Sequence, residues 1–76
     1  MFTRIVSDPA VLGGKPCISG SRISVEFILE LFASGATHAD ILHAYPHLTQ
    51  EDIGEALQYA ARFLKNESIL LAQVAT

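Results

Sequence analysis

The chain has 76 residues, which allows one small domain and leaves no room for a second hydrophobic core. Half of the residues are hydrophobic and only 17% are charged, a composition that excludes a wholly disordered chain. Five Lys and Arg against eight Asp and Glu give a net charge of −3, whereas a free-standing nucleic-acid-binding domain is typically basic. Any contact with DNA must therefore come from a local basic patch or from a partner.

So short a domain usually depends on a disulfide, a metal or a second subunit for its stability. The single cysteine, Cys17, excludes an intramolecular disulfide, and no ligand cluster indicates a structural zinc. We therefore expect a homodimer or a bound partner. The N-terminus lacks the apolar stretch of a signal peptide, and the longest aliphatic run, residues 69–72, cannot span a bilayer. We expect a cytoplasmic protein with no membrane segment.

Residues 1–23 are interrupted by Gly and Pro, with short apolar pairs between the interruptions. The interruptions are Asp8-Pro9, Gly13-Gly14-Lys15-Pro16 and Gly20-Ser21, and the pairs are Ile5-Val6, Val11-Leu12 and Cys17-Ile18. This pattern excludes a helix and favours short strands at the apolar pairs. We predict a β-hairpin, or else an extended arm, over residues 1–23.

From Ser24 onward the apolar residues recur with helical spacing. The spacing predicts a first helix that Ser24 caps and Gly35 ends. A short second helix begins at Thr37, where Asp40 completes a capping box, and Pro46 stops it.

The third predicted helix has the clearest start signal, since Thr49 caps it and Asp52 sits at the third position. Its apolar face consists of Ile53, Ala56, Leu57, Ala60 and Leu64, with Tyr59 and Phe63 beside them. The fold class is therefore mainly α with a small N-terminal β-hairpin, and the helices form a three-helix helix-turn-helix core of winged or homeodomain-like type. We predict a single domain, 1–76, in which the core spans residues 24–66.

Residues 67–76 form an apolar C-terminal tail whose conformation the sequence leaves open. A short strand, a continued helix and a segment that orders only on a partner all fit the pattern. The candidate partner-binding residues of this tail are Ile69, Leu70, Leu71 and Val74.

A helix-turn-helix would place the third helix in the recognition position. Its first turn carries Gln50 followed by two acids, and carboxylates repel phosphates, so Gln50 alone is a candidate for reading a base. The other candidate nucleic-acid-binding residues are Arg4, Lys15 and Arg22, which gather into one patch if the hairpin strands pair. The alternative is that these charges are solvated on the hairpin surface.

Other motifs argue against an enzyme. The Gly-Gly-Lys-Pro run at 13–16 resembles a phosphate-binding loop only superficially, because its proline removes an amide where the helix would begin. His38, His43 and His47 do not share one helical face, so we expect no metal site. Cys17 has no evident basic partner and is interpreted as a buried small side chain. We expect no catalytic residues and no cofactor.

Residues 14–23, Gly-Lys-Pro-Cys-Ile-Ser-Gly-Ser-Arg-Ile, resemble the Gly-Lys-Pro-x-Ile-x-Gly-Thr-Arg-Ile signature of domain-of-unknown-function family 433. The resemblance continues in order through residues 41–49 and 52–60, and it covers residues 3–65. Ser21 stands where the family usually has Thr. The tail lies outside the family pattern.

The resemblance implies an N-terminal β segment followed by a helix-turn-helix core, often dimeric. It also implies a non-enzymatic, VapB-type antitoxin-like protein that binds and neutralises a PIN-like nuclease toxin and binds operator DNA. The apolar tail would then order on the toxin. Two alternatives remain: a stand-alone helix-turn-helix DNA-binding regulator, and a dimeric structural or interaction domain of unassigned function.

Overall fold

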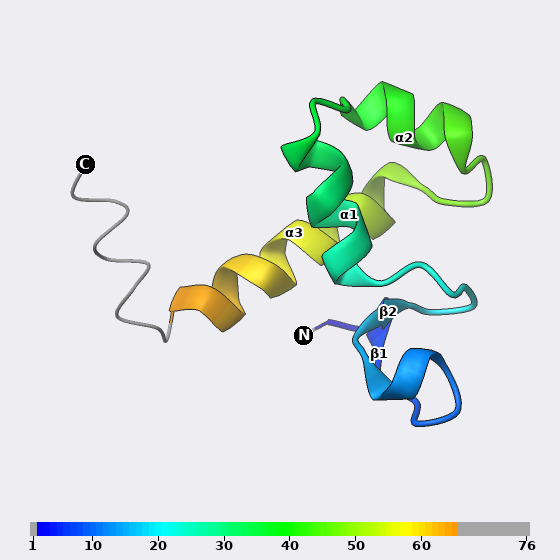
Figure 1. Ribbon diagram of the computed structural model, residues 1–76, viewed down its shortest axis with the longest axis vertical. Helices are drawn as coiled ribbons and strands as arrows, with labels where there is room; N and C mark the ends of the chain where they lie inside the picture. Colours follow the sequence, from blue (N-terminus) through cyan, green and yellow to red (C-terminus); the bar gives the residue numbers. More distant parts are fainter. Residues whose placement is uncertain (1, 66–76) are drawn as a thin grey trace.

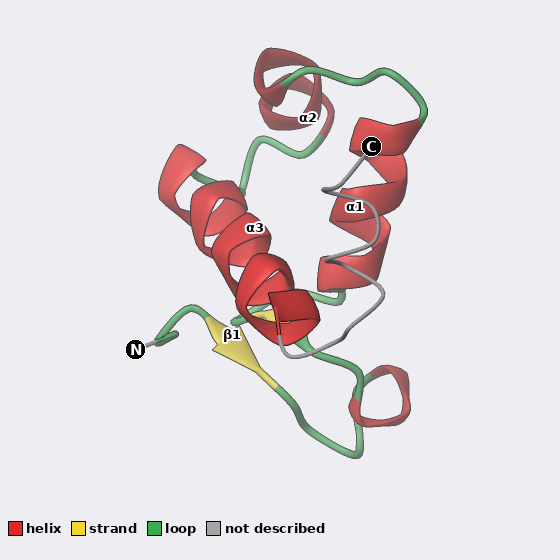
Figure 2. Ribbon diagram, turned by 90° about the vertical axis from the view of Figure 1, so that its left-hand side faces the viewer, coloured by secondary structure: helices red, strands yellow, loops and turns green. Residues whose placement is uncertain are grey.

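The computed structural model describes residues 2–65, which form a mainly α-helical fold with a small N-terminal hairpin, as predicted. The elements in chain order are β1 (Ile5–Val6), a 3₁₀ turn η1 (Leu12–Gly14), β2 (Cys17–Ile18), α1 (Val25–Ala33), α2 (His38–Ala44) and α3 (Gln50–Lys65). Helices α1 and α3 pack against each other in the middle of the molecule, with α2 at one end and the hairpin at the other (Figures 1 and 2). No helix within residues 2–65 has the length and apolar character that a bilayer span requires.

The hairpin pairs β1 antiparallel to β2, with Ile5 opposite Ile18 and Val6 opposite Cys17. Ile5, Cys17 and Ile18 are buried, whereas Val6 is exposed. The predicted hairpin is confirmed, and burial of its β2 residues fastens the N-terminal segment to the helices.

The apolar pair Val11-Leu12 was predicted to be a strand, and this prediction was wrong. The pair leads into the turn η1, where Leu12, Gly13 and Gly14 have φ values of 51°, 66° and 90°. Three successive residues with positive φ cannot continue a strand, and glycine adopts this conformation at no steric cost. The local turn chemistry of the two glycines therefore overrides the β propensity of the apolar pair.

A tight turn closes the chain between β2 and α1. The Ile18 amide donates to the Ile23 carbonyl (2.9 Å), and the Ser21 amide donates to the Ile18 carbonyl (3.0 Å). The Ser21 hydroxyl donates to the same Ile18 carbonyl (2.8 Å) and accepts from the Ile23 amide (3.1 Å). A hydroxyl residue at position 21 thus has a structural role in the turn.

Helix α1 begins and ends where the sequence predicts. The Ser24 hydroxyl accepts from the Phe27 amide (2.9 Å), which satisfies one of the free donors of the first turn. Gly35 follows the helix with φ at 102°, a left-handed conformation that terminates it.

Capping boxes start both α2 and α3. The box of α2 consists of Thr37 and Asp40, and the box of α3 consists of Thr49 and Asp52. In each box the Thr hydroxyl accepts a hydrogen bond from the Asp backbone amide (3.1 Å), and the Asp carboxylate accepts one from the Thr backbone amide (2.9 Å). The two predicted boxes are confirmed.

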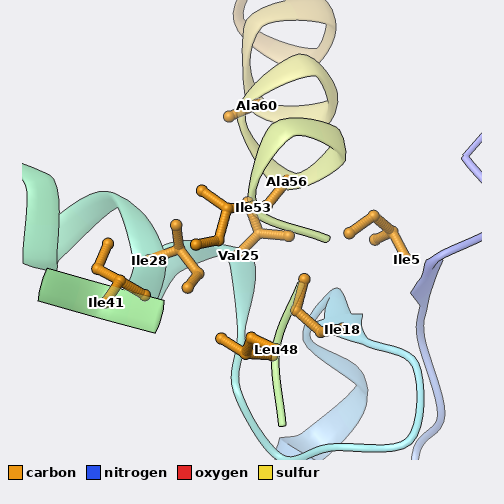
Figure 3. Packing of buried hydrophobic residues seen from close by; sticks show 9 residues of the cluster. All are labelled: Ile5, Ile18, Val25, Ile28, Ile41, Leu48, Ile53, Ala56 and Ala60. Carbon is orange, nitrogen blue, oxygen red and sulfur yellow. The ribbon is translucent and has the colours of Figure 1, made fainter. Parts of the chain in front are cut away.

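The hydrophobic core joins all three helices to the hairpin (Figure 3). Its most deeply buried isoleucines are Ile28 of α1, Ile41 of α2 and Ile53 of α3. The complete buried cluster is Ile5, Ile18, Val25, Ile28, Ile41, Leu48, Ile53, Ala56 and Ala60. Because each element contributes to one cluster, the helices and the hairpin hold each other in place.

Candidate interaction surface

The three basic residues of the N-terminal segment do not form one free patch. Arg4 lies against the start of α3, where its guanidinium contacts the carboxylate of Asp52 at 3.1 Å. The backbone amide of Arg4 also donates to the carboxylate of Glu55. Arg4 is therefore engaged with two acids of α3.

Lys15 is paired as well. Its ammonium lies 2.9 Å from a carboxylate oxygen of Glu26 on α1, and both side chains are well exposed. The hydrogen bond and the charge of Glu26 raise the pKa of Lys15 above its ordinary value. An exposed pair of this kind adds little stability, but it leaves the local charge near zero.

Lys15 and Arg22 do lie together, in a depression of about 410 Å³ between η1 and α1. The depression is lined by Leu12, Lys15, Arg22, Ser24, Glu26, Phe27 and Glu30. Two carboxylates therefore accompany the two cations. The predicted gathering of Lys15 and Arg22 is present, in a mixed-charge setting that Arg4 does not line.

Gln50 is the first residue of α3 and is exposed, which leaves its amide accessible to a partner. Glu51 beside it is exposed, and Asp52 is buried against Thr49 and Arg4. The start of α3 therefore exposes the side-chain amide of Gln50 and the carboxylate of Glu51. The carboxylate of Asp52 instead bonds to other groups of the fold.

Asp52 is the acid of this turn that the fold perturbs most directly. Partial burial works to raise its pKa, but hydrogen bonds from the Thr49 amide and the Arg4 guanidinium outweigh this effect and lower the pKa below its ordinary value of 3.8. Asp52 therefore stays ionised at neutral pH.

The feature that the sequence did not predict is an apolar groove of about 340 Å³ between α1 and the second half of α3. Its lining residues are Lys15, Pro16, Val25, Glu26, Leu29, Tyr59, Ala60, Phe63 and Leu64. Among these described residues, the charged ones are Lys15 and Glu26, which pair with each other. Such a surface suits an apolar partner and offers almost no polar group to orient a small substrate.

The predicted buried face of α3 ends earlier than its apolar pattern. Ala60 is buried, but Phe63 is 61% exposed and Leu64 is 40% exposed. The 16 residues of α3 make it about 24 Å long, whereas the nine residues of α1 span about 14 Å, so α1 cannot cover the whole length of α3. The last turns of α3 extend past the other elements (Figure 1), and this mismatch in length was the available signal for the groove.

The predicted partner-binding residues Ile69, Leu70, Leu71 and Val74 lie outside the described residues, as does the whole of the tail 67–76. Within residues 2–65, the groove is an apolar surface that the structure describes.

His38 and the cysteine contact other parts of the fold, whereas His43 and His47 are exposed. The ring of His38 lies against that of Phe32, with centroids 5.0 Å apart. Cys17 is buried, and its thiol donates to the Lys15 carbonyl at 3.2 Å, which confirms its interpretation as a buried small side chain. Within residues 2–65, no group of three or more His, Cys, Asp or Glu residues could hold a metal ion.

A family model described as "Protein of unknown function (DUF433)" matches residues 5–60, which include both strands, α1, α2 and most of α3. A crystal structure of a DUF433 member protein from Anabaena variabilis ATCC 29413 is similar, with a TM-score of 0.74 and 30% sequence identity. The similarity covers 96% of this chain and 69% of that chain. Curated proteins give no match.

Proposed function

The chain belongs to the DUF433 family of proteins of unknown function, and on this premise we propose that it is a non-enzymatic, antitoxin-like protein that binds and neutralises a PIN-like nuclease. The choice of a nuclease as the partner rests on the family resemblance of the sequence. As part of the same proposal, the protein acts in the cytoplasm, needs no cofactor and uses its tail residues Ile69, Leu70, Leu71 and Val74 on the nuclease.

The observation that carries the proposal is the engagement of the basic residues. Arg4 is paired with Asp52 and Lys15 with Glu26, and the guanidinium of Arg62 lies over the ring of Phe2 at 5.4 Å. A nucleic-acid-binding surface needs several cations directed at phosphates. Within residues 2–65 these cations are directed at the protein itself, which favours a protein partner.

The sign of the charge supports the same partner. Glu51 is exposed at the start of α3, Glu26 and Glu30 are exposed on α1, and the whole chain carries −3. A nuclease that cleaves RNA needs a basic cleft to hold its substrate. An acidic protein is attracted to such a cleft and competes there with RNA.

A second candidate function is binding to operator DNA through a helix-turn-helix formed by α2 and α3. Two observations favour it: Gln50 is exposed at the start of α3, and Arg22 is exposed beside Lys15. The acids that accompany these residues weaken phosphate contact, so we assign DNA binding a secondary role that the complex with the nuclease would strengthen.

The test is affinity capture of the tagged full chain from its native cells, with and without digestion of nucleic acids. We expect a small nuclease in stoichiometric amount in both samples, and the purified chain should inhibit RNA cleavage by that nuclease. Recovery of DNA without a protein partner would overturn the antitoxin assignment in favour of a stand-alone regulator.

Two full-length double variants separate the surfaces. Leu70→Asp with Leu71→Asp should abolish inhibition of the nuclease, because it places two charges in the proposed contact. Arg22→Ala with Gln50→Ala is the matched control, which should leave inhibition intact and reduce only operator binding. If both variants inhibit the nuclease as strongly as the unmodified chain does, the tail does not contact the nuclease.

A further inference from the structure

Arg22 and Glu30 line the same depression between η1 and α1, and the fold makes no use of their charges. Among the hydrogen bonds and ion pairs within residues 2–65, none involves the guanidinium of Arg22 or the carboxylate of Glu30. We propose that this depression binds a free basic amino acid, whose carboxylate pairs with Arg22 and whose side-chain cation pairs with Glu30. This inference goes beyond the proposed nuclease partner and does not depend on it.

The two unused charges are set apart along α1. Arg22 precedes the helix cap Ser24 by two residues, whereas Glu30 follows this cap by six residues, about 9 Å along the helix. A guanidinium pairs with a carboxylate through two parallel N–H bonds, and the carboxylate of Glu30 accepts in the same way from an ammonium or guanidinium group. The depression therefore fits a ligand that is anionic at one end and cationic at the other.

The other two charged groups of the depression compensate each other. The ammonium of Lys15 contacts one carboxylate oxygen of Glu26 at 2.9 Å, which leaves the second oxygen to accept from the α-ammonium group of the ligand. Glu26 is the main cause of the raised pKa of Lys15, and Glu30 adds a smaller effect of the same sign, so Glu30 lies within electrostatic reach of this pair. The four charges sum to zero, which disfavours a simple anion such as phosphate.

Apolar walls suit the stem of such a ligand. Leu12 of η1 is 43% exposed, and Phe27 of α1 is half-buried with its ring held edge-on by Tyr45, at a centroid distance of 5.9 Å. Lysine and arginine carry a stem of about three or four methylene groups that lies readily along an apolar surface. The volume of about 410 Å³ lies in the range of small-molecule sites.

The backbone conformation of Leu12 supports a binding role for this wall. Its φ of 51° is a left-handed conformation that costs free energy in a leucine, and such residues concentrate at ligand-binding positions. The buried hydrophobic cluster does not include Leu12, so its side chain adds nothing to that cluster. The strained turn instead holds an apolar side chain at the depression.

The test is an NMR titration of the isotope-labelled full chain with L-arginine. We expect saturable shifts at the amides that line the depression, with a dissociation constant on the order of 1 mM, as suits a small ligand at an exposed site. Agmatine lacks the carboxylate and citrulline lacks the side-chain charge. Each should bind at least about tenfold more weakly than arginine, because each loses one charged contact.

Substitutions assign the two ends of the ligand. Arg22→Ala and Glu30→Gln should each weaken arginine binding about tenfold. In addition, Arg22→Ala should bind agmatine as well as arginine, and Glu30→Gln should bind citrulline as well as arginine, since each variant has lost the group that discriminates. Asp8→Asn and Arg62→Ala are the matched controls, because they remove the same charges outside the depression. Both should bind like the unmodified chain, with the same helix content by circular dichroism.

Several results would overturn the proposal: no saturable shift with arginine, shifts that spread beyond the depression, or equal weakening in the control variants. Tighter binding of inorganic phosphate than of arginine would reassign the depression to phosphate groups. Tighter binding of Nα-acetylarginine, which lacks the α-ammonium group, would reassign it to the C-terminal residue of a peptide. Because the titration uses the purified chain without nuclease or DNA, its failure would leave the proposed function intact.

Discussion

The guanidinium of Arg4 lies 3.1 Å from a carboxylate oxygen of Asp52, although the two residues are 48 positions apart. The other carboxylate oxygen of Asp52 accepts from the Thr49 amide. One side chain thus caps α3 and ties the residue before β1 to that helix. Because Arg4 also donates its amide to Glu55, the N-terminal segment is held along the first turns of α3.

Replacement of Asp52 should therefore cost more than loss of an ordinary capping box. We expect Asp52→Ala to lower the free energy of unfolding by about 1 to 2 kcal/mol, since it removes the cap and leaves Arg4 without its carboxylate. Asp40→Ala is the matched control, because Asp40 completes the same box in α2 but is exposed and has no arginine partner. Urea denaturation of both variants measures the difference, and an equal loss in the two would show that Arg4 contributes nothing.

The lowered pKa values of Asp52 and Asp40 predict acid lability. For Asp52, burial opposes the shift but the bonds from Thr49 and Arg4 prevail; for Asp40, the Thr37 amide is the main cause. A carboxyl group with a lowered pKa in the folded state stabilises fully above its unfolded pKa of about 3.9 and loses this contribution as pH falls through the folded value. We expect the free energy of unfolding to drop below about pH 4. The drop should be shallower in Asp52→Asn, and an identical profile in the two proteins would contradict the assignment.

Two glycines should respond in opposite directions to the same substitution. Gly35 ends α1 with φ at 102°, so Gly35→Ala forces a side chain into a strained conformation and should destabilise the fold by about 1 kcal/mol. Gly54 lies inside α3 at an ordinary helical position, with open space where a Cβ would lie. Gly54→Ala should stabilise the fold by about 0.5 to 1 kcal/mol. Thermal unfolding of the two variants provides the check, and a shift in the same direction would contradict it.

The hydroxyl of Ser21 should be required by the turn before α1. Ser21→Ala removes one bond to the Ile18 carbonyl and one from the Ile23 amide, and we expect a loss of about 1 kcal/mol. Ser21→Thr keeps the hydroxyl and should retain the stability of the unmodified chain. Ser19→Ala, at an exposed position of the same loop, serves as the control. If Ser21→Ala behaves like Ser19→Ala in chemical denaturation, the hydrogen bonds of the turn are not stabilising.

The sequence alone determined the local features of this protein. Ser24, Thr37 and Thr49 were predicted as helix caps, Gly35 as a helix end, and the hairpin as the N-terminal element, and the structure agrees in each case. These features depend on residues within a few positions of each other, so hydrophobic spacing and capping chemistry are sufficient to find them. The error at Val11-Leu12 has the same local origin, since two adjacent glycines outweighed an apolar pair.

The tertiary structure decided what the charged and apolar side chains are available to do. The sequence suggested that Arg4 and Lys15 bind phosphate groups. In the folded chain, however, Arg4 lies close enough to Asp52, and Lys15 close enough to Glu26, to form ion pairs. Likewise, the sequence shows the apolar stripe of α3, but the exposure of Phe63 within this stripe is a property of the packed structure. Periodicity reports which residues share a face of one helix, whereas burial and pairing depend on how far the neighbouring element reaches along that face.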